Sequence, residues 1–245
     1  MKADLKVVAI IQARMGSKRL PGKILAPVAG EPLLAHIVNR ISPAKLIDQL
    51  IVATTQSPND NDVEKLMNKL NVPCFRGSEE DCLDRFYQAA KKYGADIIVR
   101  LTGDNPLIDS EFVDWMIEQY LLFSPPYDYI DSALSKTFPV GLSVEIFSFL
   151  ALTKAWKEEK NIQLREHVTP FIYRQPNLFR IKCLVNPINY SHMRWTMDTP
   201  QDLVFIRHIF DHFGHDQFSW RDVIALLEEH PKWLEINQNI EQKII

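Results

Sequence analysis

The beginning of the chain combines a short apolar run with a segment whose apolar residues recur every three or four positions. Residues 5–11 read LKVVAII, a run rich in β-branched residues and bounded by polar ones. Such a run is typical of a strand buried on both faces of a sheet. In residues 32–41, apolar side chains fall at positions i, i+1, i+4, i+5 and i+8, which predicts a helix with one buried stripe and Pro32 at its start. The first unit is therefore predicted to be strand, loop and helix.

The same unit recurs through the first 120 residues. Further strands are predicted at residues 49–54, 72–75 and 95–101, and helices at about 59–70 and 81–93. Strands that alternate with helices of about a dozen residues favour a parallel sheet covered on both faces. We therefore expect a doubly wound α/β core.

The second half of the chain is less regular. Its pattern predicts strands at residues 127–130, 142–147 and 179–185, and helices at 163–173 and 200–213. No linker rich in Gly and Ser and no run of like charges separates the halves. We expect a single domain over residues 1–245, with a core at 1–123 and an elaborated remainder at 124–245.

Composition excludes several classes of protein. The 245 residues carry 28 Lys and Arg against 31 Asp and Glu, a formal net charge of −3, so nucleic acid is not an expected partner. The apolar runs are far shorter than the ~20 residues that span a membrane. No secretory leader is recognisable, which favours a cytoplasmic location. Cys74, Cys82 and Cys183 match no zinc or redox spacing and are expected to be reduced thiols.

The segment that follows the first predicted strand is the strongest candidate site. Four cations lie within the ten residues 14–23: Arg14, Lys18, Arg19 and Lys23. Gly16 and Gly22 allow close approach of the backbone, and the Ser17 hydroxyl can donate, so the segment suits a triphosphate. A solvated basic loop is the alternative. The spacing matches neither the P-loop nor the dinucleotide fingerprint.

Acidic residues in two later segments are further candidates. Asp104 comes after Gly103 and the apolar run 95–101, a placement suited to holding Mg²⁺ against phosphate oxygens. Asp109 is better explained as the N-cap of the next helix, with Ser110 as the alternative. In the segment 194–203, either Asp198 or Thr199 caps a helix and the other is free. Sequence spacing does not place Asp198 near Asp104.

Together these motifs resemble a known enzyme family. The matching stretches are residues 11–23, 30–33, 103–108, 138–147, 165–170 and 198–203. The chain resembles the cytidylyltransferases that make CMP-activated acidic sugars, such as the 3-deoxy-manno-octulosonate and acylneuraminate enzymes. It looks most like their relatives named spore coat polysaccharide biosynthesis protein F. The resemblance covers nearly the whole chain.

This resemblance implies a fold and a site. The expected fold is the Rossmann-like, GT-A type nucleotide-diphospho-sugar transferase fold, an α/β domain with a mixed, mainly parallel sheet. The implied nucleotide site comprises Ala13, Arg14, Gly16, Ser17, Arg19, Lys23, Thr102 and Asp104, with Arg14, Lys23 and Asp104 in the catalytic role. Asp104 and Asp198 would hold the catalytic Mg²⁺. The residues expected to line the sugar pocket, in the second half, are Glu145, Arg165, Glu166 and His167, although Arg165 and Glu166 fit a surface ion pair equally well.

The resemblance also implies a reaction. A hydroxyl of an acidic sugar, of the 2-keto-3-deoxy or nonulosonic type, would attack the α-phosphorus of CTP and release pyrophosphate, for surface polysaccharide synthesis. The related enzymes are homodimers, and a homodimer is expected here. One alternative is a glycosyltransferase of the same fold, but its Asp-x-Asp metal motif is matched only by Asp60-Asn61-Asp62 at a predicted helix start. Another is a nucleotide-binding module without catalysis.

Overall fold

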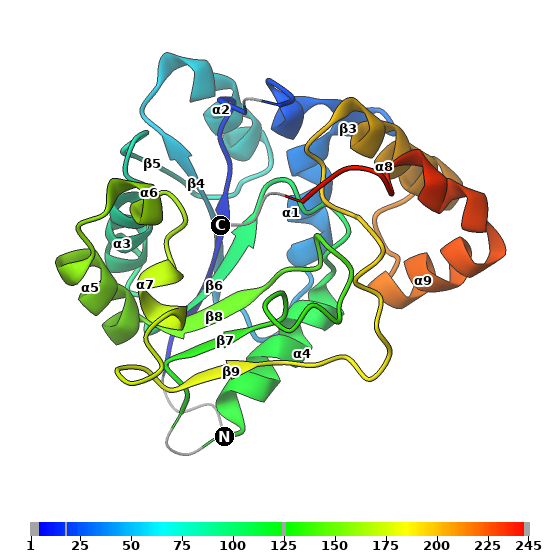
Figure 1. The fold of residues 1–245 in the computed structure, drawn as a ribbon. Coiled ribbons are helices and arrows are strands. Elements are labelled where there is room, and N and C mark those ends of the chain that lie inside the picture. The colour runs from blue at the N-terminus through cyan, green and yellow to red at the C-terminus, as the bar shows by residue number, and fades with distance from the viewer. Residues whose placement is uncertain (1–4, 18, 124–125, 243–245) are drawn as a thin grey trace.

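A seven-stranded sheet forms the centre of the molecule (Figure 1). The computed structural model describes residues 5–17, 19–123 and 126–242. The strand order is β5-β4-β1-β6-β8-β7-β9, and β8 runs antiparallel to both of its neighbours. The strands are β1 (Val7–Gln12), β4 (Gln49–Thr55), β5 (Cys74–Gly77), β6 (Ile97–Thr102), β7 (Tyr129–Asp131), β8 (Glu145–Ser148) and β9 (Ile181–Cys183). A small hairpin of β2 (Pro27–Val28) and β3 (Glu31–Pro32) lies apart from this sheet.

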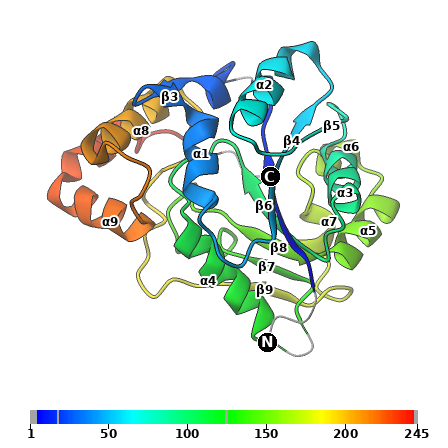
Figure 2. The ribbon, with the colours of Figure 1, turned by 180° about the vertical axis from the view of Figure 1, so that it is seen from behind.

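Helices cover both faces of the sheet, as the two opposite views show (Figures 1 and 2). The α-helices are α1 (Leu33–Ile41), α2 (Asn61–Lys69), α3 (Cys82–Lys92), α4 (Ser110–Leu121), α5 (Phe149–Glu158), α6 (Ile162–Arg165), α7 (Pro170–Tyr173), α8 (Pro200–Phe213) and α9 (Trp220–Glu229). Short 3₁₀ turns are η1 (Lys23–Leu25), η2 (Pro58–Asp60) and η3 (Pro231–Ile236).

The residues of β1 divide between two apolar cores. Val7, Ala9 and Ile11 belong to a core shared with α1, α2, α4, α8 and α9, whereas Val8 and Ile10 belong to a core shared with α3, α5 and α7. All five are completely buried. A strand in this position must be apolar at successive residues, because both of its faces are covered. The prediction of a central, doubly buried first strand is confirmed.

The predicted elements of the first half are confirmed with small shifts, whereas part of the second half is wrong. The third strand covers residues 74–77 rather than 72–75. The single helix predicted over 163–173 is two short helices, α6 and α7. Val168 has a left-handed φ of 68° between them, and Pro170 at the start of α7 has no N–H to donate, so one helix cannot run through. Helices α5 and α9 were not predicted.

The sheet unites both halves of the chain into one domain. Strand β8, from the second half, pairs with β6 from the first, and β7 and β9 extend the sheet beyond it.

Cys74, Cys82 and Cys183 are free thiols, as predicted. Within the described ranges, no helix has the length and apolar character needed to cross a bilayer.

Candidate active site

The basic segment after β1 folds into a compact loop held by backbone and carboxylate contacts. The Met15 carbonyl accepts from the N–H groups of Ser17 (2.8 Å) and Gly22 (3.1 Å). Asp60, only 2% exposed, accepts from the Met15 N–H at 2.7 Å and from the Thr55 N–H at 3.1 Å. Gly22 has a φ of 71°, which glycine adopts readily, and it leads into η1 with Lys23 as its first residue. The loop thus presents Lys23 at the carboxyl edge of the parallel strands.

Asp60 is a residue of this site that sequence reasoning missed. Its position suggested only a helix start, but its carboxylate ties the end of β4 to the loop after β1. The Asp60-Asn61-Asp62 stretch therefore does not form an Asp-x-Asp metal motif. Asp62 pairs instead with Lys65 on the exposed face of α2 (2.8 Å).

Gly103 permits the close approach that brings Asp104 to the same edge. Its N–H donates to the Gln12 carbonyl at 2.8 Å, and a Cβ at position 103 would lie 3.1 Å from that oxygen and from the Ala13 Cβ. Thr102 donates its hydroxyl to Asp104 Oδ1 at 2.7 Å. The glycine therefore allows the strand-end loops to touch, and the threonine orients the carboxylate that follows it.

The segment 194–199 crosses this edge and brings Asp198 to Asp104. The Met197 N–H donates to the Asp104 carbonyl at 2.7 Å, and Thr196 Oγ1 donates to the same oxygen at 3.2 Å. Thr199 caps α8 in a capping box with Asp202. Of the two candidates for the cap, Thr199 is the one used, and the Asp198 side chain is left for the site. Asp109 likewise caps α4, as expected.

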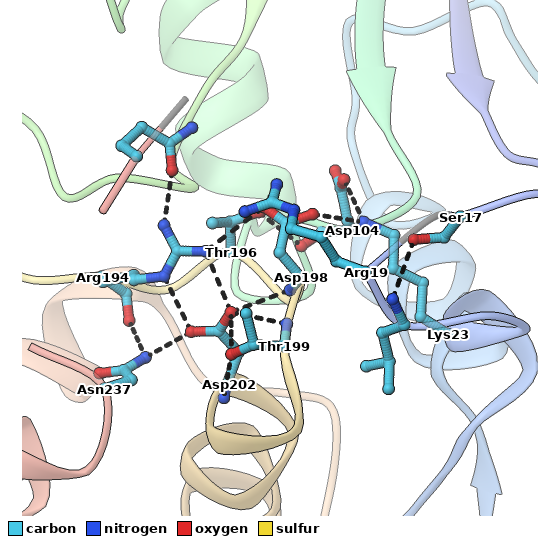
Figure 3. A network of polar contacts seen from close by, with 12 residues as sticks. Ser17, Arg19, Lys23, Asp104, Arg194, Thr196, Asp198, Thr199, Asp202 and Asn237 are labelled. Carbon is cyan, nitrogen blue, oxygen red and sulfur yellow. Dashed lines mark hydrogen bonds and ion pairs between the residues drawn. The ribbon is translucent and has the colours of Figure 1, made fainter. Parts of the chain in front are cut away.

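The three segments converge on the Lys23 ammonium group (Figure 3). Lys23 Nζ lies 2.6 Å from Asp104 Oδ2 and 2.8 Å from Asp198 Oδ1. Arg19 Nη2 lies 2.7 Å from Asp198 Oδ2. Side chains separated by 94 and 175 positions in sequence therefore share one cluster of charge, a proximity that spacing along the sequence does not show.

The charges of this cluster stabilise one another. Burial lowers the pKa of Lys23, but the Asp104 and Asp198 carboxylates outweigh burial and the net pKa is raised above its ordinary value. Burial raises the pKa of Asp198, but the cations Lys23, Arg19 and Arg194 outweigh burial and hold it below the usual range. At neutral pH, Lys23 is a cation and Asp198 is an anion.

The remaining residues of the predicted nucleotide site lie along the same loop. Arg14 points to the α6–α7 side, where Nη2 contacts Glu166 Oε1 at 3.0 Å and Nη1 contacts the Glu79 carbonyl at 3.4 Å. Ser17 Oγ accepts from the Leu20 N–H at 3.4 Å. Lys18, a fourth predicted phosphate contact, lies outside the described residues. Ala13 is buried, and Gly16 is exposed beside Ser17.

The residues predicted to line a sugar pocket have partners within the protein. Glu145, 6% exposed, accepts from Tyr129 OH at 2.7 Å and Thr169 Oγ1 at 2.5 Å, and it pairs with Arg100. Arg165 pairs with Asp81 at 2.8 Å and not with Glu166, which pairs with Arg14. Burial lowers the pKa of the half-buried His167. The role of these four residues in sugar binding stays a prediction.

Comparison of the sequence with known proteins points to one enzyme family. Residues 8–230 match the family model described as cytidylyltransferase. An uncharacterized protein of Methanocaldococcus jannaschii is 43% identical over 98% of this chain and 97% of its own length. The spore coat polysaccharide biosynthesis protein SpsF of Bacillus subtilis is 34% identical over 92% of this chain and 95% of its own.

Solved structures show the same fold. The structure of a cytidylyltransferase from Leptospira borgpetersenii superposes with a TM-score of 0.91, at 34% identity, over 98% of this chain and all of that one. The CMP:2-keto-3-deoxy-manno-octonic acid synthetase complexed with CTP, at 20% identity, superposes with a TM-score of 0.66 over 84% of this chain and 99% of that one. The family model over residues 8–230 and the relatives that are similar over nearly the whole chain establish that it belongs to the cytidylyltransferase family.

Proposed function

We propose that this enzyme transfers CMP from CTP to a hydroxyl of an acidic sugar and releases pyrophosphate, for the synthesis of a surface polysaccharide. The observation that carries this proposal is the convergence of Lys23, Asp104 and Asp198 at the carboxyl edge of the parallel strands. In open α/β sheets, ligands gather at this edge. Phosphoryl transfer needs mainly positioning and neutralisation of charge, which cations and carboxylates supply without an activated nucleophile.

The cations of the loop have distinct expected roles. Lys23 and Arg19 are close enough to share the Asp198 carboxylate, so both can reach phosphates at that point. Arg14 is more than a third exposed and lies against Glu166, from which it can turn to a phosphate at the other end of the loop. Together the three would spread positive charge along a triphosphate and stabilise the charge that develops on the leaving pyrophosphate.

The residues present fit the predicted magnesium ion. Asp104 and Asp198 supply hard carboxylate oxygens, which are the ligands that Mg²⁺ prefers together with waters and substrate phosphates. No group of three or more metal-ligating side chains occurs in the described ranges, so an Mg²⁺ ion held by this pair would need waters and substrate phosphates for the rest of its coordination. Asp104 and Asp198 would hold the ion, which would supply further charge neutralisation at the phosphates.

The sugar and the assembly belong to the same proposal. SpsF, named for spore coat polysaccharide biosynthesis, supports a surface polysaccharide as the destination of the product. Val185 and Ile188, which follow the edge strand β9, are 64% and 59% exposed and offer apolar surface to a second copy in a homodimer. We place the enzyme in the cytoplasm, where CTP is made. The mass of the particle in solution, measured by light scattering, tests the dimer.

The proposed reaction is tested by pyrophosphate release. The purified protein is incubated with CTP, Mg²⁺ and a panel of 2-keto-3-deoxy and nonulosonic acids, with neutral hexoses as controls. We expect release that depends on one acidic sugar and falls when CTP is replaced by UTP or ATP. The absence of release with every acidic sugar, or transfer from a nucleotide-sugar in its place, would contradict the proposal.

A further inference from the structure

Arg194 is a buried guanidinium group that connects Asp198 to the α8 start. Its side chain is 5% exposed. Nε and Nη2 contact the two carboxylate oxygens of Asp202 at 2.9 and 3.0 Å, and Nη2 also contacts Asp198 Oδ2 at 3.3 Å. A planar guanidinium held by two such bonds has one orientation. The position of Asp202 therefore sets the direction from which Arg194 approaches Asp198.

The segment 237–242 completes the set of contacts around Arg194 (Figure 3). Asn237, 3% exposed, donates from Nδ2 to the Arg194 carbonyl and to Asp202 Oδ1, both at 2.9 Å. Both partners are acceptors, so the amide nitrogen must face them. Gln242 Oε1 accepts from Arg194 Nη1 at 2.5 Å. In Figure 1 this segment, in red, runs from the side of α8 and α9 back toward the centre of the molecule.

Asp198 has two kinds of partner in this arrangement. Lys23 and Arg19 belong to the basic loop and are the cations that a triphosphate would draw toward its own oxygens. Arg194 is fixed by Asp202 and Gln242, so its contact with Asp198 persists when the other two change partners. A carboxylate that ligates a metal depends on such outer partners for its orientation.

We propose that Asn237 and Gln242 are positioning residues, which act through Arg194 to keep the Asp198 carboxylate facing Asp104. The segment 237–242 would then influence how well the site binds a divalent cation through its contacts with Arg194 and Asp202. This inference rests on the proposed function, because it gives Asp198 the role of a metal ligand. A purely structural role would let the Arg194–Asp198 contact contribute to stability alone, whereas a positioning role also makes it affect the binding of the cation.

Calorimetry with a non-reactive nucleotide tests the inference. The probe is a CTP analogue with a methylene group between the α- and β-phosphates, titrated into the full-length protein with Mg²⁺ and again with EDTA. The ratio of the two dissociation constants gives the gain in affinity due to Mg²⁺. We expect Asn237→Ala and Gln242→Ala each to reduce this gain about tenfold or more, the usual effect of losing an outer partner of a metal ligand. Affinity in EDTA should not change.

Asn239→Ala is the matched control, since Asn239 is an exposed asparagine of the same segment. This variant should keep the full gain. If the wild-type protein shows no gain with Mg²⁺, the proposed function itself fails. If the wild type shows the gain and the variants keep it, even with lowered melting temperatures, the segment has only a structural role and the inference is overturned. Should Asn237→Ala not fold, Gln242→Ala decides, because the Gln242 residue is exposed.

Discussion

Asp198 and Thr199 are neighbours in sequence with separate roles, and two variants distinguish them. Asp198→Asn removes a charge beside Lys23 and Arg19, and we expect turnover to fall by roughly two orders of magnitude or more. Thr199→Ala removes the α8 cap, which should cost ~1 kcal/mol of stability and leave most of the activity. Steady-state kinetics of both variants measures the change in turnover, and denaturant unfolding measures the change in stability. Full activity in Asp198→Asn would contradict the assigned role.

Stability does not separate the two residues as cleanly as activity does. The cations around Asp198 hold its pKa low, so the ionised carboxylate stabilises the folded state at neutral pH. If Asp104 and Asp198 share a metal site, as the resemblance implies, the two carboxylates should repel one another without their cation, and neutralising one should stabilise the fold slightly. The structure reverses that expectation, because Lys23, Arg19 and Arg194 surround Asp198. A modest loss of stability in Asp198→Asn is therefore expected and does not count against its role.

Lys23 allows a prediction that links the loop to the metal. In Lys23→Met, the Asp104 and Asp198 carboxylates lose the ammonium that neutralises both. We expect weaker binding of CTP, and a melting temperature that Mg²⁺ raises more in the variant than in the wild type, because the ion then relieves the repulsion. Lys65→Met, on the exposed face of α2, is the control and should match the wild type. An equal effect of Mg²⁺ on all three proteins would argue against a metal at this pair.

At the scale of elements, Gly141 fixes how the segment 194–199 passes the rest of the chain. Its φ is 108°, and a Cβ there would lie 2.5 Å from the Thr196 nitrogen. Gly141→Ala must displace this segment and with it Asp198, so we expect a loss of several kcal/mol or failure to fold. Gly214→Ala is the matched control: φ is 67° and nothing lies within 4 Å, so a cost of about 1 kcal/mol is expected. Denaturant unfolding compares the two.

The elements also show which parts of the fold the sequence can predict. Strands β1, β4 and β6 each contain an unbroken run of three to five apolar residues, and α8 begins at a Thr-Pro pair with an acid at its third position, so local pattern is sufficient for them. Helix α5 was missed because it begins directly after β8 within one largely apolar stretch, residues 146–152, and its cap Ser148 is the one polar residue there. The spacing of apolar residues cannot show where the strand ends and the helix begins within such a run.

The residues of the candidate site also divide into those that the sequence identifies and those that it does not. Residues of the basic loop and Asp104 could be found from their positions after predicted strands. The roles of Asp60, Asp202 and Asn237 could not, because each depends on contacts across 35 to 45 residues of sequence that tertiary packing creates. Thr169, a partner of Glu145, and Asp81, which pairs with Arg165, lie 24 and 84 residues away in the sequence. A pattern of side chains along the chain carries no signal for such pairs.

At the scale of the whole molecule, His36 joins α1 to the connection between α8 and α9. Nδ1 lies 2.5 Å from Asp216 Oδ1 and Nε2 lies 2.7 Å from the Val28 carbonyl. Both partners are acceptors, so the ring satisfies both only when it is protonated. Burial lowers the pKa of His36, but the contacts with Asp216 and Val28 outweigh burial and raise it above its ordinary value.

The stability of the whole molecule should therefore depend on pH through this histidine. Because the pKa is raised in the folded state, its contribution is fully present below the unfolded value of about 6.5 and is lost as the pH rises through the folded pKa. We expect the melting temperature of the wild type to fall over that interval, and His36→Gln to show a smaller fall, since glutamine does not titrate. His208→Gln, at an exposed position of α8, is the control and should keep the wild-type slope. Equal slopes in all three proteins would show that His36 does not titrate over this interval and that the pH dependence has another source.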